Sequence, residues 1–356
     1  MDLTGLPRNM DVSGLPRVVP RPAPPGSIPL IAVEGTAYEC GRQYAEIVRA
    51  KYPGYREYLD QAYGWAALNA ESKKLVESHA PHLFELYRGV IDGAGPRQSA
   101  PPSPAKTGCT AFALHPSVTL DGIPISGQTK DTYLGRLALY IVLRMRIIGA
   151  PTILTLCYPG EIIGYGMWLP GLCRFRHNMY AKPSAKTSPL NNGVLALACM
   201  SCRTVHQAVE LICRYGGAGA GGLLMSDSQG DAVAVDTTAG GAGFVWARDG
   251  VLTRSNHPEA LEGVPFAEYP CKGAQEDSHY RTHGLRRLLE AERGRLTPQK
   301  ALAIMADHSV YPRGPCKHWN EDGDTTTCFV MCEPTKGLLH AVRGQPCCNW
   351  PVTYTV

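Results

Sequence analysis

Three segments of the chain combine residue types and spacings that could carry chemistry. Cys199-Met-Ser-Cys202 has the spacing of a redox dithiol or half a zinc site, before a predicted helix whose N-terminus would lower a thiol pKa. Residues 217–222 match the glycine pattern of dinucleotide-binding loops. The third candidate is Cys109, which follows Gly108 where a proline-rich segment gives way to a predicted strand. A strand-edge cysteine without a catalytic role is its alternative interpretation.

The order of elements weakens the first two candidates. A dinucleotide loop follows a strand and opens a helix, whereas 217–222 follows the predicted helix 204–215, as a helix-to-strand connection would. No second cysteine pair follows Cys202 at zinc-ribbon spacing, so burial is the simpler interpretation of Cys199 and Cys202, with a redox or zinc protein as the alternative class. Burial is also expected of four later cysteines without metal-like spacing: Cys328, Cys332, Cys347 and Cys348.

The composition bounds the classes of function. Lys and Arg (35) nearly balance Asp and Glu (31) in 356 residues, and without a basic run this disfavours a nucleic-acid partner. The 13 cysteines are an odd number and the first ten residues lack an apolar signal, which favours reduced thiols and a cytoplasmic protein. The most apolar stretch, 137–158, carries Arg144 and Arg146 and follows Arg136, so no membrane span is expected.

The first hundred residues are predicted to be mostly helical. Residues 1–27 form a flexible, proline-rich arm that cannot build a core, and a strand follows at 28–33. A capping box from Thr36 to Glu39 opens a helix that Pro53 ends. Two more helices are expected at 56–70 and 72–93, followed by a linker at 94–107.

From Cys109 the pattern becomes that of strands. Segments 109–120 and 123–130 flank Asp121-Gly122, which favours a type I′ hairpin turn. In that register Asp131 faces Phe112, which is about 10 Å along the strand from Cys109. The side chains of Asp131 and Cys109 would then lie on opposite faces of the sheet, unless a bulge near Pro116 shifts the pairing.

The rest of the chain mixes strands and helices. A strand is expected at 194–198, a helix at 204–215, and a meander at 223–225, 232–237, 244–247 and 251–255. Helices follow at 278–293 and from Thr297-Pro298, and short strands end the chain. Without regular βαβ alternation, this order indicates an α+β fold.

Eight short motifs are spread along the chain. The first five are Gly35-Thr-Ala-Tyr-Glu39 with Gly41, Gly108-Cys109-Thr110, Gly127-Gln-Thr-Lys-Asp131, Ser255-Asn256-His257 and Ser278-x-x-Arg281. The last three are Asp307-His308, Cys316-Lys-His318 and Thr326-Thr-Cys328. In their order and spacing these motifs resemble the acyl-coenzyme A:isopenicillin N acyltransferase family, also called the C45 peptidase family. The resemblance runs from about residue 30 to the C-terminus.

This resemblance implies an N-terminal nucleophile hydrolase: a four-layer αββα sandwich of two antiparallel sheets between helical layers. It also implies a zymogen that cuts its own Gly108/Cys109 bond. Fragments 1–108 and 109–356 would stay associated, with 28–108 and 109–356 forming one domain. Gly108 suits this position because it has no Cβ and tolerates strained conformations, so the thiol can approach the preceding carbonyl.

After the cut, Cys109 would be nucleophile and base in one residue, because its new α-amino group (pKa about 8) can deprotonate its own thiol (about 8.5). The resemblance implies that Asp131 holds the amino group or substrate, that Asn256 donates into an oxyanion hole, and that Arg281 neighbours the nucleophile. Each residue also has an interpretation without a catalytic role. Asp131 would be a solvated carboxylate at the end of the hairpin, Asn256 an amide that caps a loop, and Arg281 a cation on the face of a helix. Substrate contacts are predicted at Thr110, Lys130 and Arg254.

No metal ligand and no cofactor is expected, although a coenzyme A thioester can serve as acyl donor. His257, His308 and His318 are predicted to be structural. Thr129-Lys130 stand where the penicillin enzyme has Asn-Trp, which disfavours penicillin substrates. We therefore predict an amidohydrolase or acyltransferase acting on a small N-acyl amine or peptide-like amide. A coenzyme A-dependent transferase, a Cys199/Cys202 redox or zinc protein and a noncatalytic binding protein are the alternatives, and homo-oligomers are compatible with each.

Overall fold

The computed structural model describes the chain in several segments, and both residues of the predicted cleavage site, Gly108 and Cys109, lie within them. These segments are 26–52, 65, 68–95, 108–179, 190, 192–216, 221–238, 241–247, 250–260, 273–318 and 324–356. The predicted arm lies almost wholly outside these residues, as do most of the predicted helix 56–70 and most of the linker. In the described part, no helix has the length and apolar character needed to cross a bilayer.

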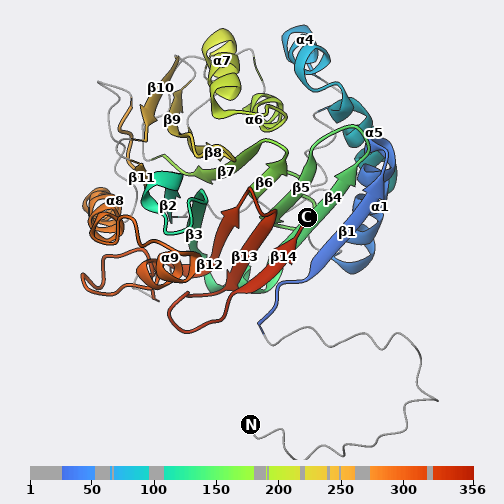
Figure 1. Ribbon diagram of the computed structural model, residues 1–356. Coiled ribbons are helices and arrows are strands. Elements are labelled where there is room, and N and C mark those ends of the chain that lie inside the picture. Colours follow the sequence, from blue (N-terminus) through green and yellow to red (C-terminus); the bar gives the residue numbers. More distant parts are fainter. Residues whose placement is uncertain are drawn as a thin grey trace, which may run out of the picture.

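Two stacked β-sheets form the centre of the molecule (Figure 1). The larger has the order β1-β4-β5-β6-β7-β8-β9-β10 and the smaller the order β11-β2-β3-β12-β13-β14. The larger sheet consists of β1 (Leu30–Gly35), β4 (Ile141–Ile147), β5 (Thr152–Cys157), β6 (Tyr165–Leu169), β7 (Leu172–His177), β8 (Gly221–Asp227), β9 (Ala232–Thr238) and β10 (Gly241–Trp246). The smaller consists of β2 (Gly108–Leu114), β3 (Ile125–Tyr133), β11 (Val251–Arg254), β12 (Asp324–Glu333), β13 (Leu338–Arg343) and β14 (Val352–Thr355).

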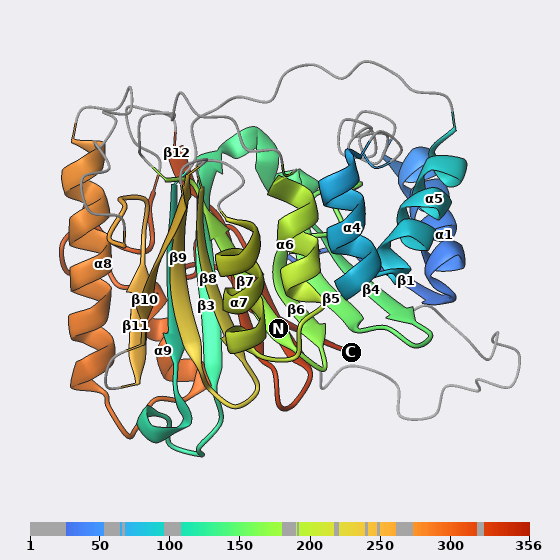
Figure 2. The same cartoon turned by 90° about the horizontal axis from the view of Figure 1, so that it is seen from above.

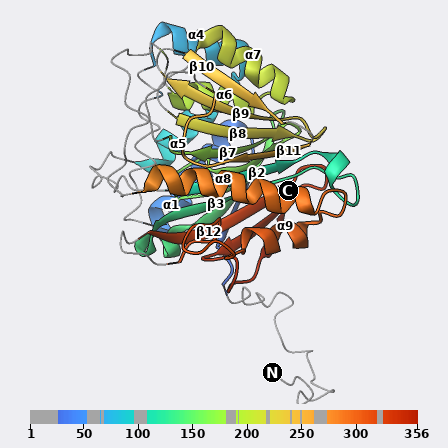
Figure 3. The same ribbon diagram turned by 90° about the vertical axis from the view of Figure 1, so that its left-hand side faces the viewer.

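Helices cover the outer face of each sheet (Figure 2). The larger sheet carries α1 (Ala37–Lys51), α4 (Ala70–His79), α5 (His82–Ala94), α6 (Asn192–Met200) and α7 (Val205–Tyr215). The smaller carries α8 (Ala274–Ala291) and α9 (Pro298–Met305), which lie in front of it in Figure 3. The predicted four-layer αββα sandwich is confirmed, except that β1 runs parallel to β4, so the larger sheet is not wholly antiparallel.

The side chains of β2 alternate between two hydrophobic cores and so join the layers of the sandwich. Ala111 and Ala113 belong to the apolar cluster between the two sheets, whereas Phe112 and Leu114 belong to the cluster under α8 and α9. Successive side chains of a strand point to opposite faces, so β2 contributes to two cores. By this alternation Cys109 lies on the inter-sheet face, and Thr110 lies on the face toward α8.

The first helix begins as predicted, and its packing requires glycine. Thr36 and Glu39 form the complete capping box. A Cβ on Gly41 would come within 2.0 Å of the carbonyl oxygen of Leu86, and one on Gly89 within 2.0 Å of that of Tyr38. The backbones of α1 and α5 therefore touch directly at these two positions.

Several predicted elements differ from the structure. The single helix expected at 72–93 is two, α4 and α5, because Pro81 lies between them as the N-cap of α5. The strand expected at 194–198 is part of α6; its continuous apolar run fits a buried helix equally well. The predicted meander ends early, because β11 leaves the larger sheet and pairs with β2.

The register of the predicted hairpin was also wrong. Gly108 faces Asp131 and Cys109 faces Lys130, because β2 ends at Leu114 and a short 3-10 helix, Pro116–Val118, occupies part of the connection. Gly122 does adopt the left-handed conformation of a turn, with φ 68°. The shift brings Asp131 next to the nucleophile candidate instead of about three residues away.

Candidate active site

Strands β2 and β3 place the candidate nucleophile beside a cation. Cys109 is fully buried, and the Nζ of Lys130, on the facing position of β3, donates to its Sγ at 3.7 Å. Burial raises the pKa of the Cys109 thiol above its ordinary value, while the charge of Lys130 opposes that rise. In the uncut chain the thiol is therefore held in its protonated form, with a cation ready to stabilise the thiolate.

Asp131 lies against the bond that is predicted to be cut. Its Oδ1 accepts a hydrogen bond from the Oγ1 of Thr326 at 2.8 Å. Its Oδ2 is buried and has no hydrogen-bond partner among the described residues. A methyl group on Gly108 would lie 3.1 Å from this oxygen. An uncommitted carboxylate oxygen thus faces the backbone immediately before Cys109.

Asn256, just after β11, contacts the backbone nitrogen of Cys109. Its Oδ1 accepts from the Cys109 N–H at 3.1 Å and from Nη2 of Arg281 at 2.7 Å, and these two donors identify that atom as the oxygen. Its Nδ2 donates to the carbonyl of Asn178 at 2.9 Å. The donor predicted for an oxyanion hole is therefore engaged elsewhere in the uncut chain.

Arg281, on α8, is fully buried and links the nucleophile to an acidic partner. Its Nη1 donates to the Cys109 carbonyl and, at 2.8 Å, to the Oγ1 of Thr110. Its Nε donates to Asp277 at 2.9 Å. Burial would raise the pKa of Asp277, but Arg281 and Lys317 hold it below the ordinary value, so the carboxylate stays charged. Cys109, Asp131, Asn256 and Arg281 are thus brought together, while their catalytic roles stay predictions.

The three predicted substrate contacts occupy different settings. Lys130 contacts the thiol, and Thr110 is buried with its hydroxyl bound to a guanidinium. Arg254 is fully buried and pairs with Asp236 and with Glu259, the latter at 3.0 Å. The guanidinium of Arg254 is therefore paired with carboxylates of the protein itself. Its contact with substrate stays a prediction.

A histidine without an assigned role lies near this network. His177, at the end of β7, is buried, and neither ring nitrogen has a hydrogen-bond partner among the described residues. Burial and nearby cations hold its pKa well below the ordinary value, so it is neutral. Sequence analysis also gave no role to Ser255, whose Oγ donates to the Cys109 carbonyl at 3.0 Å. Its position inside the Ser255-Asn256-His257 motif was the available signal.

The cysteine predictions had mixed outcomes. Cys328 and Cys332 are buried in β12 as expected, but Cys347 and Cys348 are exposed because they lie in the turn after β13. Cys199 lies inside α6, not between a strand and a helix, and burial raises its pKa. Its Sγ donates to the Ala208 carbonyl, while that of Cys202 donates to a different carbonyl. Neither thiol has the exposed, electropositive setting of a reactive dithiol.

A second group of side chains gathers away from the thiol site. His308, Cys316, His318 and Cys347 place one possible metal-ligand atom each within 4.8 Å of one another. The first three are close in the sequence, and Cys316-x-His318 was the available signal. The fourth is 29 residues beyond His318, a separation that no local spacing rule detects.

A cavity of about 530 Å³ lies along α8, where His279, Tyr280 and His283 form part of its lining, and Cys109 is not among the lining residues.

Comparisons with known proteins give a likeness of fold at low identity. No protein-family model matches the chain, and no curated protein matches its sequence. A mutant of the conjugated bile acid hydrolase from Clostridium perfringens is similar with a TM-score of 0.43 and 11% identity, covering 70% of this chain and 97% of that one. Penicillin V acylase from Agrobacterium tumefaciens is similar with a TM-score of 0.43 and 13% identity, covering 66% and 83%. At these values the likeness does not bear on activity or substrate.

Proposed function

We propose that the protein is a self-processing N-terminal cysteine amidohydrolase of the acyl-coenzyme A:isopenicillin N acyltransferase (C45) family, with the N-terminal nucleophile hydrolase fold. The observation that carries the proposal is the surroundings of the Gly108/Cys109 bond. A buried thiol with a cation at 3.7 Å lies beside a carboxylate oxygen that has no partner among the described residues. The amide nitrogen between them already donates to Asn256.

The first step is cleavage of the chain. The Sγ of Cys109 attacks the Gly108 carbonyl carbon, and its proton passes to the leaving nitrogen as the C–N bond breaks, which gives a thioester and a free amine. Water then hydrolyses the thioester, which releases a Gly108 carboxylate and restores the thiol. In this proposal Asp131 Oδ2 would accept the thiol proton on the way; its position beside Gly108 and its lack of a hydrogen-bond partner among the described residues support that role.

The new α-amino group finds two acceptors already in place. Asn256 Oδ1 accepts from the same nitrogen before cleavage, and Asp131 Oδ2 can accept a second hydrogen. Between two acceptors the amine is fixed close to its own thiol and can act as general base toward it. The charge of Lys130 favours the thiolate that results.

The mature enzyme would then transfer an acyl group through Cys109. The thiolate attacks the carbonyl carbon of an amide, the amine leaves with a proton from the α-ammonium group, and an acyl-cysteine forms. Water attacks the thioester in the second half, with the amine again as base. For Asn256 to donate into an oxyanion hole, its Nδ2 must leave the Asn178 carbonyl, which cleavage would have to permit.

The substrate we propose is a small N-acyl amine or peptide-like amide. Cys109 is fully buried and three cations, Lys130, Arg281 and Arg176, are within its electrostatic reach, so an anionic or carbonyl-rich acyl group is favoured. A coenzyme A thioester as donor and an amine as acceptor would use the same acyl-cysteine. The two activities differ in whether hydrolysis proceeds without added thioester.

Intact-mass spectrometry of the denatured protein tests the proposal. The wild-type chain should give two fragments that begin at Met1 and Cys109, and Cys109→Ala should remain one chain of 38.5 kDa. Cys328→Ala is the matched control, because this buried thiol lies on the neighbouring strand opposite Lys130 and should not affect the cut. One uncut species from all three proteins would overturn the self-processing mechanism. The mature protein is then assayed on N-acyl amines with and without coenzyme A thioesters.

A further inference from the structure

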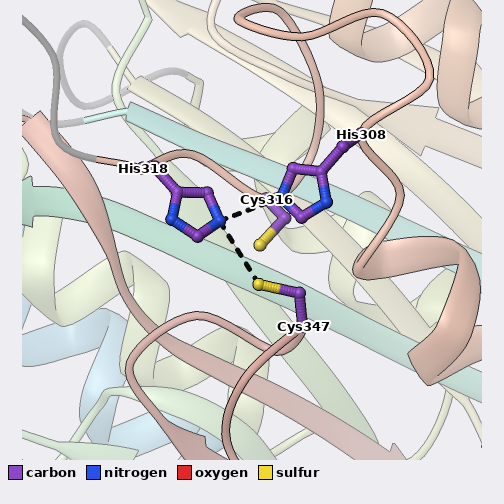
Figure 4. A group of neighbouring side chains, drawn as sticks. All are labelled: His308, Cys316, His318 and Cys347. Atoms are coloured by element: carbon purple, nitrogen blue, oxygen red, sulfur yellow. Dashed lines mark hydrogen bonds between the residues drawn. The ribbon is translucent and has the colours of Figure 1, made fainter.

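Two surface segments meet at the side chains of His308, Cys316, His318 and Cys347, called here the His–Cys cluster. The first three residues belong to the loop that follows α9, and Cys347 belongs to the turn that follows β13. All four side chains point toward a common centre (Figure 4). Their ligand atoms, one per residue, lie within 4.8 Å of one another.

The spacing of these atoms is close to that of a tetrahedral zinc centre. The Nε2 atoms of His308 and His318 are 2.9 Å apart, and the Sγ of Cys347 is 3.3 Å from Nε2 of His318. Zinc bonds of about 2.0–2.1 Å to nitrogen and about 2.3 Å to sulfur place tetrahedral ligand atoms about 3.3–3.8 Å from one another. The shortest pair must open by a few tenths of an ångström, and the widest separation, up to 4.8 Å, must close by about 1 Å for the geometry to be complete.

The donor set selects the class of metal. Two imidazoles and two thiols offer no oxygen, which excludes a site built for Ca²⁺ or Mg²⁺. A tetrahedral set of two sulfur and two nitrogen donors suits Zn²⁺. Four protein ligands leave no position open for water or substrate, which is the arrangement of a structural zinc and not of a catalytic one.

We propose that the His–Cys cluster binds one structural Zn²⁺. On binding, both thiols release their protons to solvent, so two thiolates balance the charge of the ion and the centre is neutral. Cys316 is buried and Cys347 is exposed, so the metal would lie just below the surface with a path from solvent. A disulfide between the two cysteines would account for half of the cluster, but not for two imidazoles whose Nε2 atoms face each other.

The site would fix a residue that supports the catalytic centre. Lys317 lies between two ligands of the cluster, and its Nζ donates to Asp277 at 2.7 Å. The same carboxylate oxygen accepts from Arg281, whose other nitrogens reach the backbone and neighbours of Cys109. The zinc would therefore hold the loop after α9 in the position from which Lys317 pairs with Asp277.

Metal analysis of the full chain tests the proposal without reference to activity. The protein is made in zinc-supplemented medium, kept reduced, and dialysed without chelator before its metals are measured by mass spectrometry. We expect about one zinc per chain in the wild type and less than about 0.2 in Cys316→Ser and Cys347→Ser. The matched control is Cys348→Ser, which changes an exposed neighbouring thiol outside the cluster and should keep its zinc.

A second measurement needs no variant. The metal-free wild-type chain is titrated with Co²⁺, and sulfur-to-cobalt charge-transfer bands with tetrahedral ligand-field bands should saturate at about one equivalent. The proposal is overturned if the wild type retains less than about 0.1 zinc and shows no thiolate bands with Co²⁺. It is also overturned by a Cys316–Cys347 disulfide in the reduced preparation, or by equal loss of zinc in Cys348→Ser. The same measurements on Cys109→Ala separate this outcome from failure of self-processing.

Discussion

Replacement of Arg281 by methionine should destabilise the protein by an amount that the structure lets us work out. The buried guanidinium makes an ion pair with Asp277 and donates to the Cys109 carbonyl, to Thr110 and to Asn256. Methionine has a similar length and fills much of the same space, so the change removes these polar contacts with little new cavity.

The loss is limited because most acceptors keep another donor. Asp277 keeps Lys317, the Cys109 carbonyl keeps the Ser255 hydroxyl, and Asn256 Oδ1 keeps the Cys109 N–H. A hydrogen bond with a charged partner contributes about 1.5–3 kcal/mol, and removal of a buried cation returns its desolvation cost. We therefore expect the free energy of unfolding to fall by about 3 kcal/mol, less than the sum of the separate bonds.

Urea unfolding in a Cys109→Ala background measures this change on one uncut chain. Arg287→Met is the control, since this arginine is on the same helix but exposed, and it should change stability by no more than about 0.5 kcal/mol. The midpoint should move while the slope stays constant. A loss of less than about 1 kcal/mol for Arg281→Met, or one equal to the control, would refute the assigned network.

Three other changes test separate parts of the structure. Despite burial, a hydrogen bond from His257 and the charge of Arg254 lower the pKa of Glu259 from 4.5 to about 2, so its stabilisation is present above pH 4.5 and lost as pH falls toward 2. Urea unfolding at about pH 5 and pH 3 should show a loss of about 2 kcal/mol that Glu259→Gln lacks. Gly41→Ala should lower the free energy of unfolding, measured by thermal denaturation, by about 2–3 kcal/mol, because its Cβ would come within 2.0 Å of a carbonyl oxygen of α5. Gly284→Ala is the control and should not lower it, because no neighbouring atom of the described residues lies within 4 Å of the added Cβ. Lys130→Met should raise the pKa of Cys109 and move the pH profile of self-cleavage upward, and an unchanged profile would exclude that charge effect.

Local signals in the sequence predicted the elements that local chemistry determines. The capping box at Thr36 and the proline after Thr297 mark helix starts that the structure has. They succeed because capping depends on residues three or four apart. The four-layer fold followed instead from the resemblance of ordered motifs, since layer architecture depends on contacts between distant segments.

Non-local pairing explains the predictions that failed. An Asp121-Gly122 turn alone would set the hairpin register, but the 3-10 helix Pro116–Val118 takes residues out of one strand and shifts the pairing. The apolar run 194–198 has no periodicity that separates a strand from a buried helix. Strand β11 changes sheets because it pairs with β2, a partner more than 130 residues earlier in the chain.

The same distinction applies to the two groups of functional side chains. Cys109 and Asp131 were predicted from the family resemblance of their short motifs, and the corrected register brings them closer than the sequence indicated. The His–Cys cluster was overlooked because its fourth member comes from beyond β12 and β13. Lys317 connects the two groups physically: its neighbours in the chain belong to the cluster, while its ammonium holds Asp277 against Arg281. If zinc binds, its loss should therefore loosen the Arg281 network, because Lys317, between two residues of the cluster, pairs with the Asp277 carboxylate that holds Arg281.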